Sequence, residues 1–425
     1  MKSLLVKINN KLNAHGGFLK SVSVLVGGTA FAQIIGLLCL PILTRLYSPE
    51  DYSILGIYVA IVSIFAVIAC FRFEIAIPIS EKDEEAKSLF VLSLLSNIFL
   101  VIFLYFILWL SYPILQNFHI IRQLTIWIWL IPLGVFLSGL YSALQYWSTR
   151  RKRFKEIAQT RMTQAILGNG TSLIIGGSTG GFWGLILGQL LNFSGGLLKL
   201  SNSTYNDLKK IKKTSSLKKT LYKYSDYPKY STFEALANVS AVHLPLIIIA
   251  SFVAGPEVGY LMLAMKILGI PMALIGRAMS QVYLSHAPEF YKREQLYSYT
   301  IKILKQIFKI IVIPFLLLAL LSPHIFDLVF GEGWSGLGGY ILIMIPWYFM
   351  QILSSPISMA LHIIGFQKVA LILQIFGFIL RVGGLLVLAI IGNSFIVEYY
   401  ILSGFLFYFI YMGVIVGTIR QKGIT

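Results

Sequence analysis

Long runs of apolar residues follow one another along the chain from Ser21 to Gly417, with short polar segments between them. Each run is close to the roughly 20 apolar residues that an α-helix needs to cross the hydrocarbon core of a bilayer. The runs are continuously apolar instead of alternating, so they predict helices and not barrel strands. Twelve membrane-spanning helices are predicted, at residues 21–44, 52–78, 88–111, 123–147, 157–177, 182–198, 230–252, 258–285, 306–322, 338–362, 369–391 and 396–418.

The longest polar interval, residues 201–229, divides these spans into two sets of six. The halves resemble each other: SPEDY from Ser48 and GPEVGY from Gly255 each combine a capping residue, a proline and a glutamate at a helix start. Two six-helix bundles related by a pseudo-two-fold axis along the membrane normal are typical of transporters. The predicted parts are a cytoplasmic amphipathic segment (1–20), an N-terminal bundle (21–200), a basic cytoplasmic linker (201–229), a C-terminal bundle (230–418) and a cytoplasmic tail (419–425).

Composition agrees with an all-α integral membrane protein, because 57% of the residues are hydrophobic, only 12% are charged and the mean hydropathy is +0.79. Cys39 and Cys70 both fall within predicted spans, where they are expected to pack as small residues. The sequence indicates no disulfide and no metal site.

The formal charge of +18 is unevenly placed. If both termini are cytoplasmic, the inner segments hold 27 of the 35 Lys and Arg residues, and the outer loops hold only Arg45 and Arg122. Basic residues of short loops stay on the cytoplasmic side, so this distribution predicts the orientation. It also argues against nucleic acid as a partner.

One stretch carries a resemblance to a known family. LPILTRLYSPEDYSILGIYVAIVSIFAVIACFRFEIAIPIS, from Leu40 to Ser80, resembles the start of the polysaccharide biosynthesis flippases, which translocate O-antigen and related lipid-linked oligosaccharides within the multidrug/oligosaccharidyl-lipid/polysaccharide exporter superfamily. The resemblance implies that an undecaprenyl-pyrophosphate-linked repeat unit is moved from the inner to the outer leaflet, by alternating access through a cationic central cavity. It also implies a bacterial inner membrane protein that works without a cofactor, coupled to a proton or sodium gradient, beside membrane lipids and glycan polymerase machinery.

Four basic residues within the spans are candidate substrate-binding groups: Arg72, Lys266, Arg277 and Arg381. A charge deep in a bilayer costs about 3 kcal/mol, so it requires a partner, a wet cavity or a ligand. Arg381 is near the middle of the eleventh span, and Lys266 lies about 15 Å along a helix from Pro256. For each of the four, a structural pair or snorkelling to the interface is the alternative.

Arg72 and Glu74 are predicted to have separate partners, because residues two apart on a helix point about 200° apart. Glu74 and Glu234 are candidates for ion coupling, although either could instead neutralise a neighbouring arginine. Lys302, Lys305 and Lys309 share one side of a helix and are interpreted mainly as an interfacial stripe, with the entrance of the substrate path as the alternative.

The sequence contains no GxxxxGK[ST] loop and no histidine spacing typical of a metalloenzyme, so no enzyme is predicted. Two other functions are alternatives for a chain of this kind. A cation-coupled multidrug exporter would favour acidic cavity residues, and a glycan polymerase would present a large outer loop. Neither matches a chain whose deepest charges are basic and whose long loop is on the inside.

Overall fold

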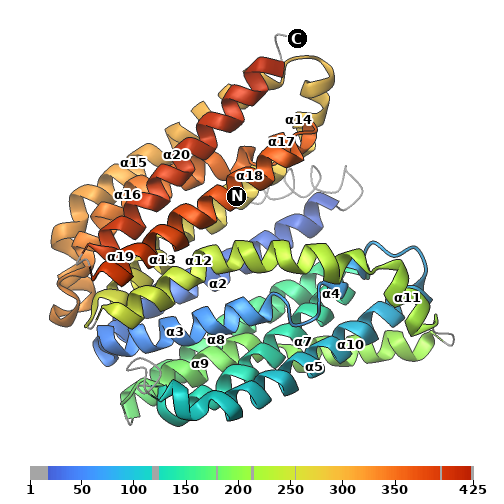
Figure 1. Ribbon diagram of the computed structural model, residues 1–425, viewed down its shortest axis with the longest axis horizontal. Helices are drawn as coiled ribbons and strands as arrows, with labels where there is room; N and C mark the ends of the chain where they lie inside the picture. The colour runs from blue at the N-terminus through green and yellow to red at the C-terminus, as the bar shows by residue number, and fades with distance from the viewer. Residues whose placement is uncertain are drawn as a thin grey trace, which may run out of the picture. The chain divides into compact units, whose positions relative to one another are not determined.

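The computed structural model describes residues 18–116, 124–178, 180–211, 215–253, 255–392 and 395–422, and every regular element within them is a helix (Figure 1). Nearly all of the predicted amphipathic segment, residues 1–20, lies outside the described part. The chain forms two compact units. Unit 1 comprises Met1–Tyr47 and Ile57–His243, and unit 2 comprises Ser48–Gly56 and Leu244–Thr425.

In unit 1, α2 packs against α8, α8 against α9, and α5 against α7. Two elements of the predicted linker also belong to this unit, since α10 packs on α7 and α11 packs on α5 (Figure 1). The helices are α2 (Phe18–Leu46), α3 (Pro49–Ala66), α4 (Phe73–Ala76), α5 (Asp83–Leu115), η1 (Thr125–Trp129), α7 (Leu130–Arg150), α8 (Phe154–Ser178), α9 (Trp183–Ser194), α10 (Leu197–Lys210), α11 (Leu217–Lys223), η2 (Tyr227–Ser231) and α12 (Thr232–Phe252), of which α3 and α12 continue into unit 2.

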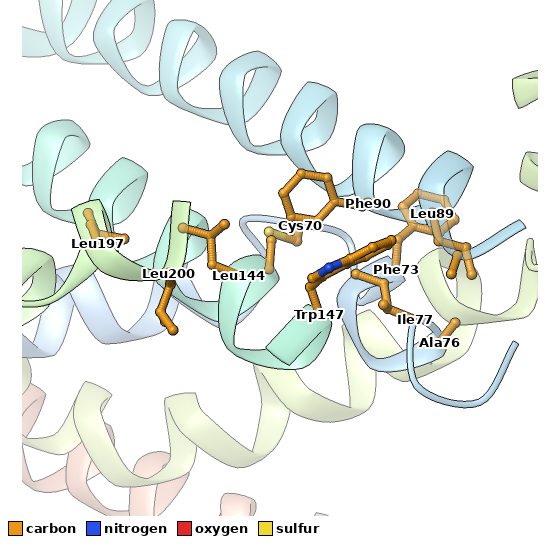
Figure 2. Close-up of a cluster of buried hydrophobic side chains, with 12 residues drawn as sticks. Cys70, Phe73, Ala76, Ile77, Leu89, Phe90, Leu144, Trp147, Leu197 and Leu200 are labelled. Carbon is orange, nitrogen blue, oxygen red and sulfur yellow. The ribbon is translucent and has the colours of Figure 1, made fainter. Parts of the chain in front are cut away.

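A buried apolar cluster joins four parts of unit 1 (Figure 2). Trp147 of α7 is fully buried at its centre and meets Phe90 of α5 edge to face, with 5.7 Å between ring centroids. Burying large apolar side chains from separate helices fixes their positions through the hydrophobic effect and close packing. The cluster draws on the segment after α3, α5, α7 and α10 through Cys70, Phe73, Ala76, Ile77, Ala86, Leu89, Phe90, Ala143, Leu144, Trp147, Leu197 and Leu200.

In unit 2, α16 is the central helix, because it packs against α13, α15 and α20. Tyr52, from the part of α3 that belongs to this unit, lies edge-on to Trp334 at 5.1 Å. The other elements are α13 (Glu257–Pro271), η3 (Met272–Gly276), α14 (Arg277–Lys292), α15 (Leu296–Phe330), η4 (Glu332–Trp334), α16 (Leu337–Ser354), η5 (Ser355–Ile357), α17 (Ala360–Ile363), α18 (Gln367–Phe378), η6 (Ile379–Gly383), α19 (Gly384–Ile391) and α20 (Ile396–Lys422).

The prediction of an all-helical, multi-pass membrane protein is confirmed, and each of the twelve predicted spans falls on one helix or a broken helix. Within the described residues, ten helices are long and apolar enough to cross a membrane. The other two predicted spans correspond to α8, which carries polar and charged residues, and to α9, which has only 12 residues.

The second predicted span, 52–78, is not one continuous helix. Regular α-helix ends at Ala66, and the chain then turns before α4 begins at Phe73. Phe71 and Arg72 have φ values of 46° and 62°, in the left-handed region that L-residues rarely adopt. Residues 67–71 are still apolar where regular helix has already ended, so hydrophobicity alone does not mark the break, and the charged Arg72 and Glu74 follow it directly.

Candidate functional site

The lysine face of α15, which we define as Lys302, Lys305 and Lys309, is the most prominent cationic feature of unit 2. All three side chains are exposed, and they follow one another along one side of the helix. They line a hollow of about 570 Å³ together with Tyr297, Ser298, Ile301 and Gln306. The described residues that line this hollow include no Asp or Glu, so its charge is entirely positive.

Sequence periodicity explains how α15 presents these lysines. Ile303, Ile307, Ile311 and Phe315 recur at intervals of four residues, are 4% exposed or less, and face the helix packing of unit 2. Lysines three, four and seven positions apart then share the opposite side. A stripe of like charges is unfavourable unless water or an anion lies against it, which makes the lysine face a candidate anion site.

The predicted candidate Lys266 lies in α13, within the candidate membrane span Glu257–Gly276, and its side chain is exposed. The opposite side of α13 is buried through Leu261, Ala264 and Leu268. An exposed lysine on an otherwise apolar helix fits a surface that water can reach. Lys266 is not among the described residues that line the hollow of the lysine face.

Arg381 is buried, with 4% of its surface exposed, in the π-helical segment η6. Its guanidinium stacks over the rings of Trp347 at 4.9 Å and Tyr400 at 5.3 Å, and one terminal nitrogen donates to the Tyr400 hydroxyl at 3.1 Å. We call Trp347 and Tyr400 the aromatic cage. Cation–π contacts and a hydrogen bond stabilise the charge without a carboxylate.

The aromatic cage connects three elements of unit 2. Trp347 comes from α16, Tyr400 from α20 and Arg381 from η6, between α18 and α19. Beside the cage, Tyr348 donates to the carbonyl of Met265 in α13 at 3.5 Å. Arg381 therefore lies inside the packing of unit 2. Its assignment as a direct substrate ligand stays a prediction.

Arg72 and Glu74 differ from the sequence expectation. They form an ion pair, with 3.9 Å between Arg72 Nη1 and Glu74 Oε1. The expectation of separate partners was wrong because it assumed a continuous helix, whereas the left-handed residues Phe71 and Arg72 turn the backbone and bring the two side chains to the same side.

Glu74 is deeply buried and incompletely paired. Its side chain is 4% exposed, whereas that of Arg72 is 24% exposed, and Glu74 Oε2 has no hydrogen-bond partner among the described residues. Glu74 lies in the connection between the candidate membrane spans Pro49–Ala66 and Asp83–Leu115. Burial raises its pKa to about 7, and the nearby Arg72 charge only partly opposes this effect.

The two remaining candidates are less informative. Arg277 is the first residue of α14, immediately after η3, but its side chain lies outside the described part of the structure. Glu234 is exposed in the first turn of α12, where a carboxylate is favourable against the positive helix end. Within the described residues, no group of three or more His, Cys, Asp or Glu side chains is placed to hold a metal ion.

Sequence reasoning found the lysine face, whose exposed side chains fit an interfacial stripe as well as the entrance of a substrate path, but it missed the aromatic cage. The spacing of the three lysines opposite buried isoleucines was available as a signal. No local signal indicates the cage, because Trp347 and Tyr400 are far from Arg381 in the chain and meet it only through tertiary packing.

Comparison with known proteins identifies both a family and a fold. The family model described as "Polysaccharide biosynthesis protein" matches residues 42–337. No curated protein sequence matches the chain.

Among solved structures, the chain is similar to the lipid II flippase MurJ in an inward closed conformation, with a TM-score of 0.68, 14% identity, and coverage of 94% of this chain and 87% of that one. An inward-facing multidrug resistance transporter of the MATE family and MOP superfamily gives a TM-score of 0.65 at 15% identity, covering 94% and 96%. A MOP superfamily transporter from Pyrococcus furiosus, described as having a binding pocket of reverse polarity, gives 0.57 at 15% identity, covering 94% and 96%. At these identities the likeness establishes the fold.

Proposed function

Because the chain belongs to the family of polysaccharide biosynthesis proteins, we propose that it is a flippase for an undecaprenyl-pyrophosphate-linked oligosaccharide repeat unit. In this proposal the repeat unit moves from the inner to the outer leaflet of a bacterial cytoplasmic membrane by alternating access. Both termini are then cytoplasmic, the lipid tail stays in the bilayer, and no bond of the substrate is broken. Glycan polymerase machinery would take up the product.

The observation that carries the proposal is the lysine face of α15. Three exposed lysines rise along a helix whose residues Leu296–Ser322 are apolar enough to span a membrane, and the described residues around their hollow include no carboxylate. A diphosphate carries the complementary charge, and each lysine can donate hydrogen bonds to phosphate oxygens. Successive sites along the helix would let the head group advance without being trapped at one of them.

A cation-coupled multidrug exporter is the second candidate, because the fold is shared with a MATE family transporter. The charge of the hollow argues against it, since cationic drugs would be repelled by the lysine face. A superfamily member described as having a pocket of reverse polarity is consistent with one fold serving substrates of opposite charge.

For the coupling step, we propose that Glu74 carries a proton. The carboxylate is buried beside one arginine at 3.9 Å, and its pKa of about 7 lets it exchange a proton at physiological pH. Protonation would weaken the attraction to Arg72 and free that guanidinium for phosphate. Glu234, being exposed at a helix start, is the weaker candidate.

The proposal is tested by reconstituting the full chain in liposomes with a defined undecaprenyl-pyrophosphate-linked glycan and measuring its exposure on the opposite leaflet. We expect translocation of the glycan lipid and none of a cationic dye. Dye transport in the absence of glycan movement would replace the flippase with the exporter, and imposing a pH gradient in the same vesicles would test the coupling.

A further inference from the structure

The basic residues at one end of unit 1 fall into two groups that the sequence does not distinguish. Three arginines of the run from Arg150 to Arg153 turn inward to carboxylates. Arg150 and Arg151 donate to Asp83 at 2.8 Å and 3.1 Å, and Arg153 donates to Asp207 at 2.8 Å. These arginines are part of the packing and are not free to bind a partner.

The same contacts hold the linker helices in place. Asp207 of α10 also accepts a hydrogen bond from the buried Trp147 indole at 3.1 Å. Lys87 of α5 donates to the carbonyl of Ile211 at the end of α10, at 2.9 Å, and Lys223 of α11 pairs with Glu85 at 2.8 Å. The linker helices α10 and α11 therefore have defined positions on α5 and α7.

Lysines cover the outer side of these elements. We define the lysine shell as Lys152, Lys155, Lys199, Lys209, Lys210, Lys218 and Lys219, all of which are exposed. Large apolar and aromatic side chains are exposed between them: Leu198 is 89% exposed, Tyr222 is 69% exposed and Tyr205 is 65% exposed. Such a mixture of cationic and apolar groups is characteristic of a surface that meets both lipid head groups and the upper acyl region.

The location of the shell favours a membrane over a soluble partner. It surrounds the residues where candidate span Asp83–Leu115 begins and candidate span Ile126–Arg150 ends, which is where helices leave the hydrocarbon core. Its charged members are lysines, whose compact and flexible charges suit a diffuse anionic surface, whereas the arginines with their planar forks are used in the inward pairs.

We propose that the lysine shell binds anionic phospholipid head groups of the inner leaflet, with Leu198, Tyr205 and Tyr222 inserted beside them. The site belongs to unit 1 alone and is separate from the lysine face of α15. It would anchor the linker to the bilayer surface through charge and apolar contact together, independently of whether the protein moves a glycan lipid.

The test uses the full chain in detergent, titrated with phosphatidylglycerol or phosphatidylcholine and followed by native mass spectrometry. We expect phosphatidylglycerol to bind at least tenfold more tightly than phosphatidylcholine. The variant Lys218→Gln/Lys219→Gln should reduce this preference about tenfold. The matched control Lys292→Gln/Lys368→Gln changes two exposed lysines of unit 2. Lys218→Arg/Lys219→Arg keeps the charge and should keep the preference.

Equal binding of both lipids would overturn the inference. An equal loss in the Lys292 and Lys368 control would also overturn it, because the effect would then come from overall charge. Binding of a soluble acidic polypeptide such as polyglutamate, without a preference among lipids, would assign the shell to a protein partner instead. Folding of each variant is checked by its melting temperature.

Discussion

Arg381 and the lysine face of α15 belong to the same unit and both lie in candidate membrane spans, yet the structure treats their charges in opposite ways. Arg381 is 4% exposed and enclosed by Trp347 and Tyr400. Lys302, Lys305 and Lys309 are exposed around a hollow of about 570 Å³. Arg381 connects helices inside the packing of unit 2, whereas the three lysines form part of its surface.

Depth in an apolar run therefore does not identify a ligand-binding charge. What decides is whether neighbouring side chains already satisfy it. Arg381 receives two ring faces and one hydroxyl, which hold its charge within the protein, and its buried Nε has no hydrogen-bond partner among the described residues. The lysine face has its own helix on one side and open space on the other, so it remains available.

The largest effect is expected from removing the lysine face. Lys302→Gln/Lys305→Gln/Lys309→Gln should lower glycan-lipid translocation at least about 100-fold, because each charge-assisted hydrogen bond to phosphate is lost. The melting temperature should stay within a few degrees, since exposed substitutions disturb packing little. Translocation in proteoliposomes is the measurement, and Lys292→Gln is the matched control. A normal rate in the triple variant would remove the lysine face from the substrate path.

Arg381→Ala should act mainly on stability, by about 3 kcal/mol, because it leaves a cavity in the aromatic cage and removes the Tyr400 hydrogen bond. Thermal unfolding in detergent measures this loss. Arg381→Met fills the space without charge and should recover much of the stability, as apolar replacements of buried charges often do.

The opposite result for Arg381→Ala would remove the difference between a structural arginine and ligand-binding lysines. If Arg381→Ala melted normally but failed to translocate the glycan lipid, the guanidinium would be a substrate ligand, as the sequence first suggested. If Arg381 is structural, transport by Arg381→Ala should fall only in proportion to the loss of folded protein.

Glu74 falls between the two cases, being buried but only half paired, and it predicts a pH dependence. Its folded pKa of about 7 is above the ordinary value of 4.5, so the folded state holds a proton that the unfolded state releases. Stability should therefore be highest below pH 4.5, fall by about 3 kcal/mol as the pH rises from 4.5 through 7, and level off above that. Glu74→Gln should flatten this dependence in thermal unfolding measured from pH 4 to 8, and an unchanged slope would contradict the assignment.

The smallest effect extends the comparison to unit 1. Asp207→Asn should cost about 1 kcal/mol, because the ion pairs with Arg153 and Arg151 are lost while the hydrogen bond from Trp147 can be kept. Lys209→Gln, two residues away and exposed, should leave the melting temperature unchanged. Equal effects of the two substitutions would mean that inward and outward charges at this end do not differ.

Long apolar runs were sufficient to predict the helices, because a helix that crosses a bilayer must be apolar over most of its length. They could not predict the turn at Phe71 and Arg72, which depends on backbone dihedrals at the end of an apolar run, so the pairing of Arg72 with Glu74 was missed. A change of helix type coincides with Pro271, where α13 ends and a π-helical segment follows. The depth of Arg381 was predictable, but its partners were not, because Trp347 and Tyr400 reach it from other helices.

The split between inward arginines and outward lysines also bears on how the protein is made. During insertion, the unfolded chain presents every basic residue of the run from Arg150 to Lys155 as an equivalent orientation signal, because guanidinium and ammonium groups both resist passage across the bilayer. Only after the helices assemble do the two side-chain types diverge, when Arg150 and Arg153 reach carboxylates that a shorter, unforked group would engage less well. A chain with lysine in place of Arg150 and Arg153 would insert into the membrane in the same orientation, but its helices would assemble less stably.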